Sequence, residues 1–273
     1  MSVRSDDDQA VYVADYWNNR IMKWDMDASK GEIVVNGSLQ TNQIDQINCP
    51  RDVLIDKKTD SLIISDLGNR QVVQCFRRNG MKPKVILSDV DGWGLAMDAF
   101  GYLYVSDYNR HEVRRWKLGE KKSVVVAGGN GAGSRLDQLH YPTYIYVDDE
   151  QSIYVSDRYN HRVVKWKSGV KQGIIVAGNQ IEGNSLKQLS DPTGIVVDRS
   201  KTVFVADSSN HRVMSWPKDA DEGSIVVGGK GHGDCSNQLY NPWGISFDGE
   251  GNLYVADNCN HRIQRFDIDT TVD

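Results

Sequence analysis

The sequence predicts an all-β fold, a six-bladed β-propeller of four-stranded antiparallel blades, from three observations: a repeat, its strand-like content and the burial its strands require. An aspartate at the end of an apolar run marks the repeat, and successive aspartates lie 51, 41, 50, 50 and 50 residues apart. A period of about 50 residues is typical of propellers, solenoids and arrays. The six aspartates are Asp15, Asp66, Asp107, Asp157, Asp207 and Asp257.

Each repeat contains four short runs that are typical of strands. The unit around Asp207 shows them in order: Gly194–Asp198, Phe204–Asp207, a run that ends at Trp216, and Ile225–Val227. The runs are rich in Val, Ile and Tyr and are bounded by Gly, Asp, Asn or Pro, as strands and their turns are. Four strands of about 5 to 6 residues, with their turns, fill such a unit.

The second run of the repeat is apolar at consecutive positions, as in Val11–Ala14. Because side chains alternate between the two faces of a strand, this strand needs an apolar neighbour on each face. Blades arranged radially supply that environment and leave only short protected edges, which a single four-stranded sheet does not. We expect the tryptophans that end the third run to pack between blades: Trp24, Trp116, Trp166 and Trp216.

One propeller fills the chain, so we expect a single domain over residues 1–273. Aligning Asp6 with Asp148 makes Met1–Ser5 a truncated innermost strand of the first blade, whereas the outer strand of the sixth blade begins near position 274. We therefore expect the last blade to lack its outer strand, unless residues 267–273 fold back or the chain is part of a longer protein. The expected blades are 1–37, 50–89, 92–128, 142–178, 192–228 and 242–273.

Three segments carry one motif at one register of the repeat: Asn160-His-Arg-Val, Asn210-His-Arg-Val and Asn260-His-Arg-Ile. Each follows a Tyr/Phe-Val-Ala/Ser-Asp run, and two copies are preceded by Pro-x-Gly-Ile-x-Val/Phe-Asp. The motif resembles the NHL repeat over nearly the whole chain, with departures at Asn19-Arg20, Asn69-Arg70-Gln71 and Arg110-His111-Glu112. The resemblance implies a six-bladed propeller that most often is a docking platform for protein or RNA, and in a minority of relatives is an enzyme.

The composition disfavours nucleic acid and the membrane as partners. The net charge is −5 with acids and bases interspersed, so no basic block marks a nucleic-acid surface. No apolar run approaches the ~20 residues of a membrane span, so we expect no membrane insertion. We expect a monomeric propeller or part of a longer chain. The cysteines, Cys49, Cys75, Cys235 and Cys259, lack zinc-ligand spacing, and a disulfide between the last two stays open. Neither compartment nor ligand follows from the sequence.

We expect the recurring polar residues to be structural. An aspartate that closes a strand accepts backbone N–H groups of the following turn, and an asparagine three residues on tolerates a left-handed conformation. Four histidines recur at one position of different blades, and packed sheets about 10 Å apart keep such side chains from converging on one metal. The sequence therefore predicts no metal, no cofactor and no catalytic residue in the motif. These histidines are His111, His161, His211 and His261.

Because the repeats act as one another's controls, a copy that departs without structural need is a candidate for function. The connection between blades two and three departs most, since it takes three residues from Asp89 to Gly92. The connections that follow Gly37, Gly128, Gly178 and Gly228 take 13 or 14 residues to the Pro of the next blade. In a propeller these connections share one face with the tips between second and third strands. We expect a notch in that face beside Trp93.

Aromatic and arginine side chains around the notch are the expected ligand-binding residues, because binding hot spots use such side chains. They are Arg51, Asp52, Trp93, Tyr108, Tyr144, Arg158, Tyr159 and Trp243. We interpret the protein as a non-catalytic interaction module that binds a protein or glycan on this face. The alternatives are a propeller enzyme of lyase or lactonase type with a metal at the channel mouth, an RNA-binding propeller, and tryptophans that only plug the channel.

Overall fold

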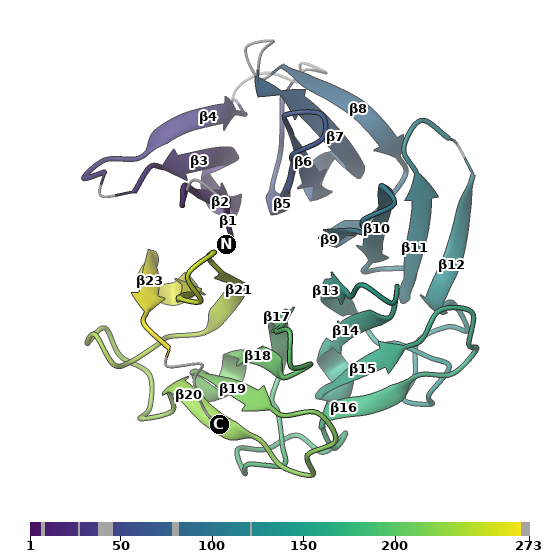
Figure 1. Ribbon diagram of the computed structural model, residues 1–273, viewed down its shortest axis with the longest axis vertical. Helices are drawn as coiled ribbons and strands as arrows, with labels where there is room; N and C mark the ends of the chain where they lie inside the picture. The colour runs from purple at the N-terminus through teal and green to yellow at the C-terminus, as the bar shows by residue number, and fades with distance from the viewer. Residues whose placement is uncertain (7–8, 27, 38–45, 78–81, 121, 269–273) are drawn as a thin grey trace.

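The computed structural model describes residues 1–6, 9–26, 28–37, 46–77, 82–120 and 122–268. It is a six-bladed β-propeller, in which six antiparallel sheets surround a central axis in chain order (Figure 1). Within each blade the strands follow one another outwards, so that the first strand is innermost. The predicted fold class is confirmed, since the regular structure of the described residues is strands and short 3₁₀ turns.

The first three blades have four strands each. Blade one comprises β1 (Ser2–Ser5), β2 (Val11–Asp15), β3 (Arg20–Trp24) and β4 (Glu32–Asn36). Blade two comprises β5 (Pro50–Asp56), β6 (Ser61–Asp66), β7 (Gln71–Phe76) and β8 (Pro83–Ser88). Blade three comprises β9 (Gly92–Met97), β10 (Tyr102–Asp107), β11 (Glu112–Lys117) and β12 (Ser123–Gly128).

The last three blades repeat the pattern, except that blade six has three strands among the described residues. Blade four comprises β13 (Pro142–Val147), β14 (Ile153–Asp157), β15 (Arg162–Trp166) and β16 (Ile174–Gly178). Blade five comprises β17 (Pro192–Val197), β18 (Val203–Asp207), β19 (Arg212–Trp216) and β20 (Ser224–Gly228). Blade six comprises β21 (Pro242–Phe247), β22 (Leu253–Asp257) and β23 (Arg262–Phe266).

The core lies between adjacent blades. In β6, the consecutive residues Leu62, Ile63 and Ile64 are all fully buried, so this second strand has an apolar neighbour on each face. Trp166 and Trp216, which end the third strands of blades four and five, are buried in clusters that include residues of the preceding blade. Burial of such side chains is the main stabilising term of the fold.

The aspartate that ends a second strand joins segments that are distant in sequence. Asp157 accepts the backbone N–H of His140 at 2.6 Å, and it also accepts Asn160 Nδ2 at 2.8 Å and Arg162 Nε at 2.7 Å. The N–H donor therefore belongs to the loop that enters the blade, and not to the following turn as expected. The equivalent entry loop donates to three more of the six aspartates, at 2.6 Å each: Asn48 to Asp66, Ser190 to Asp207, and Tyr240 to Asp257. Asp107 instead accepts the backbone N–H of Arg110 in the following turn, at 3.1 Å, as expected.

In blades one, three, four and five, a left-handed residue after the tip between the second and third strands contacts the entry to the next blade. His161, with a φ of 51°, follows the tip η4 (Arg158–Asn160), and its Nδ1 accepts the backbone N–H of Asp191 at 3.3 Å. The left-handed residue is thus the fourth after the aspartate, and not the asparagine at the third position. We call this contact a clasp. Equivalent clasps join Asn19 Oδ1 to Cys49 N at 2.7 Å, His111 Nδ1 to Tyr141 N at 3.1 Å, and His211 Nδ1 to Asn241 N at 3.1 Å.

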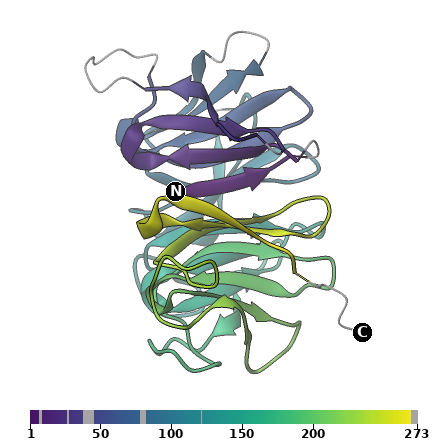
Figure 2. The same ribbon diagram turned by 90° about the vertical axis from the view of Figure 1, so that its left-hand side faces the viewer.

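Blades one and six meet at a seam that Figure 2 shows facing the viewer, with blade one in purple and blade six in yellow. β1 is the innermost strand of blade one, as predicted, and the predicted lack of an outer strand in blade six is confirmed among the described residues. Residues 269–273 of the expected fold-back lie outside the described part. Cys235 and Cys259 are free thiols, so they form no disulfide. No helix in the described residues is long and apolar enough to cross a membrane.

Candidate ligand-binding site

The loop face carries the tips between second and third strands and the blade-to-blade connections. The shortest of these connections joins β8 to β9. Residues 89–91 make this connection, and the N–H of Val90 donates to the Arg70 carbonyl at 3.1 Å. Asp89 forms ion pairs with Arg70 and Arg110 at 2.8 and 2.9 Å. The short connection is therefore held flat against the tips of blades two and three, at the place where the sequence predicts a notch.

Three large side chains meet on the axis below this face, because they occupy one position of three innermost strands. Arg51, Trp93 and Trp243 are the second residues of β5, β9 and β21. In blades four and five the equivalent residues are Thr143 and Thr193, which are small and fully buried. The two threonines leave room at the axis for the arginine and the two indoles.

Aromatic rings surround the Arg51 guanidinium. Its Cζ atom lies 3.8 Å from the ring centroid of Tyr16, 4.0 Å from that of Trp93 and 5.0 Å from that of Trp243. A guanidinium within about 6 Å of a ring face is attracted by the ring quadrupole. We call Tyr16, Trp93 and Trp243 the aromatic cage. Tyr16 opens the tip η1 (Tyr16–Asn18), so the cage joins blades one, two, three and six.

Further rings extend the cage across blades three and four. Trp93 stacks on Tyr108 with centroids 4.7 Å apart, Tyr108 lies 4.4 Å from Tyr141, and Tyr141 lies 5.0 Å from Tyr159. We call these four side chains the aromatic arc. Trp93 is 3% exposed whereas Tyr159 is 42% exposed, so the arc rises from the buried axis to the surface. Burial raises the pKa of the Tyr108 hydroxyl to about 12, with the neighbouring Tyr159 adding to the shift.

Several hydrogen-bond donors of the site are buried without an acceptor among the described residues. They are Arg51 Nε and Nη1, Trp93 Nε1, and Arg158 Nε. Burial lowers the pKa of the Arg51 guanidinium, because the cage replaces water by rings. Arg158 forms an ion pair with Asp191 at 3.2 Å through its Nη2 and lies 5.3 Å from the Tyr159 ring. Buried donors are normally paired, so these four atoms indicate that an acceptor belongs here.

Two of the expected site residues are buried and link strands of different blades, outside the aromatic cage and arc. Asp52 is fully buried and accepts Ser2 Oγ at 2.5 Å, Arg4 Nη2 at 2.9 Å and the Leu95 N–H at 2.9 Å. Tyr144 is 3% exposed, and its hydroxyl donates to the carbonyls of Met1 and Arg51 at 3.3 Å each. Asp52 therefore links β1, β5 and β9 rather than facing solvent, and Tyr144 fixes the backbone beneath Arg51.

The structure brings the other expected residues together in one chain of contacts. Arg51, Trp93 and Trp243 contact one another at the axis, and Tyr108 stacks on Trp93. Tyr141 connects Tyr108 to Tyr159, whose ring lies near Arg158. Sequence reasoning missed Tyr16, Tyr141 and His140, whose ring centroid lies 5.4 Å from that of Tyr159. A comparison of the residue before the innermost strand of blades two to six would have singled out Tyr141, since the other blades have Cys49, Asp91, Asp191 and Asn241 there.

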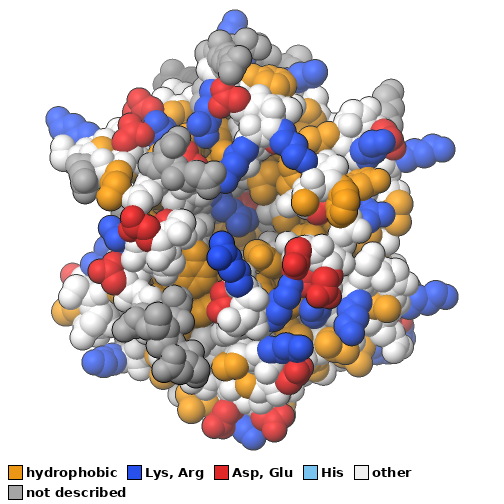
Figure 3. Space-filling model, in the orientation of Figure 1, with side chains coloured by type: hydrophobic (Ala, Val, Ile, Leu, Met, Phe, Trp, Pro, Cys, Tyr) orange, Lys and Arg blue, Asp and Glu red, His pale blue; other side chains and the backbone are white. Residues whose placement is uncertain are grey.

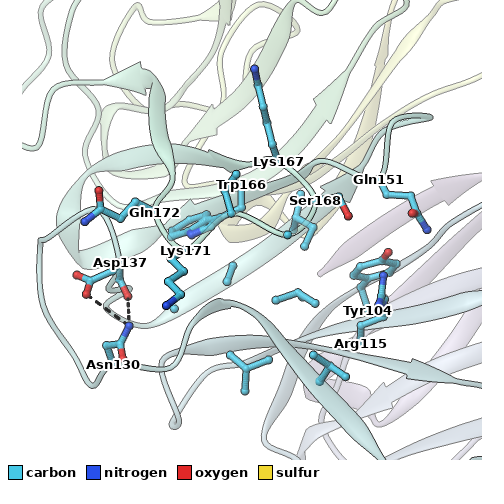
Figure 4. Close-up of a pocket in the computed structure, with 18 residues that line it drawn as sticks. Tyr104, Arg115, Asn130, Asp137, Gln151, Trp166, Lys167, Ser168, Lys171 and Gln172 are labelled. Carbon is cyan, nitrogen blue, oxygen red and sulfur yellow. Dashed lines mark hydrogen bonds between the residues drawn. The ribbon is translucent and has the colours of Figure 1, made fainter.

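Other cavities lie between blades and recur with the repeat. A cavity of about 550 Å³ between blades three and four is lined by Tyr104, Arg115 and Trp166 (Figure 4). A cavity of about 430 Å³ between blades four and five is lined by the repeat-equivalent residues Tyr154, Lys165 and Trp216. Because equivalent side chains line both cavities, we assign these cavities to the architecture rather than to a specific ligand.

No metal-ligand cluster occurs among the described residues, and the face in Figure 3 shows no basic stripe. The described residues contain no group of three or more His, Cys, Asp or Glu side chains placed to hold a metal ion. The face in Figure 3 shows Lys and Arg side chains intermixed with Asp and Glu side chains. The aromatic cage and arc are therefore the candidate site, and their chemistry is binding through rings and arginine donors.

Comparison with known proteins agrees with the fold. The sequence profile described as the NHL repeat matches residues 139–166, 189–213 and 239–266, which lie in blades four, five and six and the loops that enter them. The chain thus carries three matches to the NHL repeat, in blades four to six of a six-bladed β-propeller. No curated protein matches its sequence.

Solved structures of other propellers are similar in fold at low sequence identity. An auxiliary nutrient binding protein from Bacteroides thetaiotaomicron is 15% identical with a TM-score of 0.74, over 97% of this chain and 68% of that one. Virginiamycin B lyase from Staphylococcus aureus is 12% identical with a TM-score of 0.64, over 99% and 84%. A gluconolactonase from Xanthomonas campestris is 17% identical with a TM-score of 0.61, over 77% and 70%. These likenesses extend to the fold alone.

Proposed function

We propose that this protein is a non-catalytic binding module that holds a protein or glycan ligand on its loop face, with an acceptor group of the ligand against Arg51. The observation that carries the proposal is the guanidinium of Arg51, which is enclosed by three rings while its Nε and Nη1 have no acceptor among the described residues. An arginine held this way is preorganised to donate, since its orientation is set before the ligand arrives.

A carboxylate is the acceptor that suits this donor best. Hydrogen bonds between an arginine and a carboxylate are charge-assisted and roughly twice as strong as neutral ones. The exposed end of the arc, at Tyr159, offers a ring face on which an apolar side chain or a sugar ring stacks. Both an acidic peptide and an acidic sugar combine these features, so the proposal covers a protein or a glycan that carries a carboxylate.

The test begins with two ligand searches on the intact protein, a glycan array and a displayed library of random peptides. The tightest ligand is then titrated against the wild type and Arg51→Gln. We expect Arg51→Gln to weaken binding by about 2 kcal/mol or more, the cost typical of a hot-spot residue. Arg135→Gln is the matched control, because Arg135 is an exposed arginine paired only with Asp137 among the described residues.

Each outcome decides the proposal. A ligand that carries a carboxylate and loses affinity in Arg51→Gln, but not in Arg135→Gln, supports it, and the library in which it is found identifies it as a protein or a glycan. Equal affinity for wild type and Arg51→Gln contradicts it. Circular dichroism melts of both variants check that each one folds.

A propeller enzyme is the alternative, and the position of His140 favours it. The His140 ring lies beside Tyr159 and Tyr141 on the loop face, with centroids 5.4 and 5.2 Å away, where it could serve as a base. A structure of virginiamycin B lyase with quinupristin has the same fold. Incubation of this protein with quinupristin, followed by chromatography, tests the alternative: a new species formed by the wild type and not by His140→Ala would support an enzyme.

A further inference from the structure

A groove of about 610 Å³ follows the seam between blade six and blade one, which faces the viewer in Figure 2. Its apolar walls come from Val11, Val13 and Met22 of blade one and from Tyr254 and Ile263 of blade six. Its polar lining includes Asp15, Asn18, Arg20, His261, Arg262 and Arg265. This groove differs from the aromatic cage, because it is bordered by a strand edge that is unpaired among the described residues. Its blade-one wall is buried, and its blade-six wall, Tyr254 and Ile263, is half-buried.

The outer edge of β23 is unpaired among the described residues, whereas every other blade covers this edge. In blade four, β15 pairs with β16 from Arg162 opposite Gly178 to Lys165 opposite Ile174. In blade five, β19 pairs with β20 in the same register, from Arg212 opposite Gly228 to Ser215 opposite Ser224. An exposed edge presents unpaired N–H and C=O groups and accepts an added strand.

Residues at the seam are more exposed than the residues at equivalent positions of other blades. The side chain of Arg162 in β15 is 0% exposed and that of Arg212 in β19 is 4% exposed, whereas Arg262 in β23 is 30% exposed. Ile263 is half-buried, although its counterparts Val163 and Val213 are fully buried. The groove therefore opens positions that an outer strand closes in other blades.

Polar groups on the blade-one side lack the partners that their counterparts have. Arg162 donates to three carbonyls of the loop that enters its blade: Ser134 at 2.7 Å, Arg135 at 3.0 Å and Gln138 at 3.2 Å. Arg212 and Arg262 each repeat this set of three. The counterpart in blade one is Arg20, for which the described residues provide Asp15 as the hydrogen-bond partner and no such loop.

The same loop is missing for two more groups at the seam. Asp157 accepts a backbone N–H of its entry loop, whereas among the described residues Asp15 accepts only Asn18 and Arg20. His211 clasps the Asn241 N–H, whereas His261 has no clasp partner in the described part. One extended segment followed by one loop would supply the partners of these groups on both sides of the seam.

We propose that the seam is a docking site for a segment of a partner polypeptide that has the chemistry of the missing repeat element. The segment is a β-branched strand that ends in glycine and continues into a loop with Gln-Leu near its end, as in Ser224–Asn241 of this chain. Its strand pairs with β23 and packs its apolar residues on Val11, Val13 and Met22. Its loop offers backbone carbonyls to Arg20 and N–H groups to Asp15 and His261.

A second copy of this chain fits the groove less well. The outer strands of its first five blades are already paired within their own sheets, so a copy could donate one only by opening a blade. Pairing of two β23 edges would bring Arg262 and Arg265 of both copies together, and like charges placed opposite each other are destabilising. A partner segment with a free outer strand has neither cost.

The test uses a fluorescent synthetic peptide with the sequence of residues 222–241, in which Cys235 is replaced by Ser. Titration with the intact protein should give saturable binding, and the peptide should raise the melting temperature of the protein. A peptide in which Val226 is replaced by Pro is the matched control, because proline lacks the N–H that a paired strand donates. We expect this control to bind at least tenfold more weakly, with the protein itself unchanged.

A protein variant places the peptide at the seam. Ile263→Glu puts a charge on the groove wall and should weaken binding of the parent peptide at least tenfold, while Arg135→Gln, at an exposed arginine outside the groove, should leave its affinity unchanged. Equal binding of the parent and Val226→Pro peptides, or no saturation with the parent peptide, would overturn the proposal. A protein that sediments as a dimer and binds no peptide would assign the groove to a second copy and would overturn it too.

Discussion

Asp157 and Asp15 occupy the same position of the repeat in different surroundings. Asp157 is fully buried, pairs with Arg162, whose side chain has 0% exposure, and accepts a backbone N–H from the loop that enters its blade. Asp15 pairs with Arg20, whose side chain is 33% exposed at the seam. The two ion pairs have similar lengths, 2.7 and 2.8 Å, so burial is the variable that separates their contributions to stability.

We predict that Asp157→Ala lowers the free energy of unfolding by about 3 to 5 kcal/mol, because it leaves a buried guanidinium without its counter-charge. Asp15→Ala should cost about 1 kcal/mol or less, since an exposed pair is screened by water. Urea unfolding of both variants measures the difference. Equal losses of stability in the two variants would show that the aspartate acts through local turn structure and not through burial of its ion pair.

The histidine clasps make the stability of the fold depend on pH. Burial lowers the pKa of His111 and of His211, and the neighbouring His140 and His232 add to the respective shifts. The Nδ1 atom of each accepts a backbone N–H, which only the unprotonated nitrogen can do. Near the ordinary His pKa of about 6.5, these two histidines therefore bind more protons in the unfolded chain than in the folded chain.

We predict that the melting temperature falls as the pH is lowered from about 7 through 6.5, since stability rises with pH wherever the unfolded state binds more protons. His211→Asn should flatten this dependence, because the amide oxygen of Asn19 already makes the same clasp in blade one at 2.7 Å without titrating. Melting curves between pH 5 and 8 give the comparison. An unchanged slope in the variant would remove His211 from the account.

At the scale of the element, the connection between β8 and β9 exposes the aromatic arc. The other connections between consecutive blades carry 13 residues from strand to strand, and this one carries three. Residues 89–91 are anchored by Arg70, by Arg110 and by the N–H of Tyr108, which donates to the Asp91 carbonyl at 3.0 Å. Tyr108 is thereby held at the notch with its ring on Trp93.

We predict that a chimera in which residues 89–91 are replaced by the connection 129–141 loses affinity for the ligand of the loop face by at least tenfold. The inserted loop should cover the notch beside Tyr108. Connections of this length join the other consecutive blades, so the fold should accommodate it between blades two and three. Exchange of residues 179–191 for 129–141 is the control, since the length is unchanged. Titration of the ligand found by the array or library measures both, and unaltered affinity in the first chimera would separate the notch from binding.

The fold could be predicted from the sequence because the copies of the repeat can be aligned with one another. The period, the strand content and the ends of blades one and six all follow from that alignment. It also located Arg51, Trp93 and Trp243, because these residues depart from small residues such as Thr193 at one position. It could not separate Asp52 from them. Whether a carboxylate faces solvent or an arginine such as Arg4 depends on contacts between strands of different blades. Tyr16 was missed for the same reason, since its approach to Arg51 crosses from blade one to blade two.

At the scale of the whole molecule, the circle of blades has one junction unlike the others. Five junctions have a paired outer strand on one side, whereas at the seam the outer edge of β23 is unpaired among the residues that the structure describes. Blade one has β1 as its innermost strand, which contacts β21, so the seam is closed near the axis and open at the periphery.

We predict that amide hydrogen exchange is fastest, among the third strands, in β23. Its edge has no partner in the described residues, whereas β15 and β19 are paired on both sides. Local opening concentrates where backbone hydrogen bonds are few and exposed. Exchange measured by mass spectrometry on peptides that cover residues 162–166, 212–216 and 262–266 compares equivalent positions. Equal protection of the three would show that the seam is as cooperative as the other junctions.

In every clasp the side-chain acceptor comes before its N–H donor in the sequence, and this order determines when each clasp can form during synthesis. In each of four clasps the acceptor side chain precedes the N–H that it binds by 30 residues. A blade that leaves the ribosome is therefore unlatched until the start of the next blade has followed it, a delay of roughly 2 to 6 s at about 5 to 20 residues per second. The chain latches from its N-terminus onwards, and a nascent chain halted inside one blade keeps all the earlier latches shut.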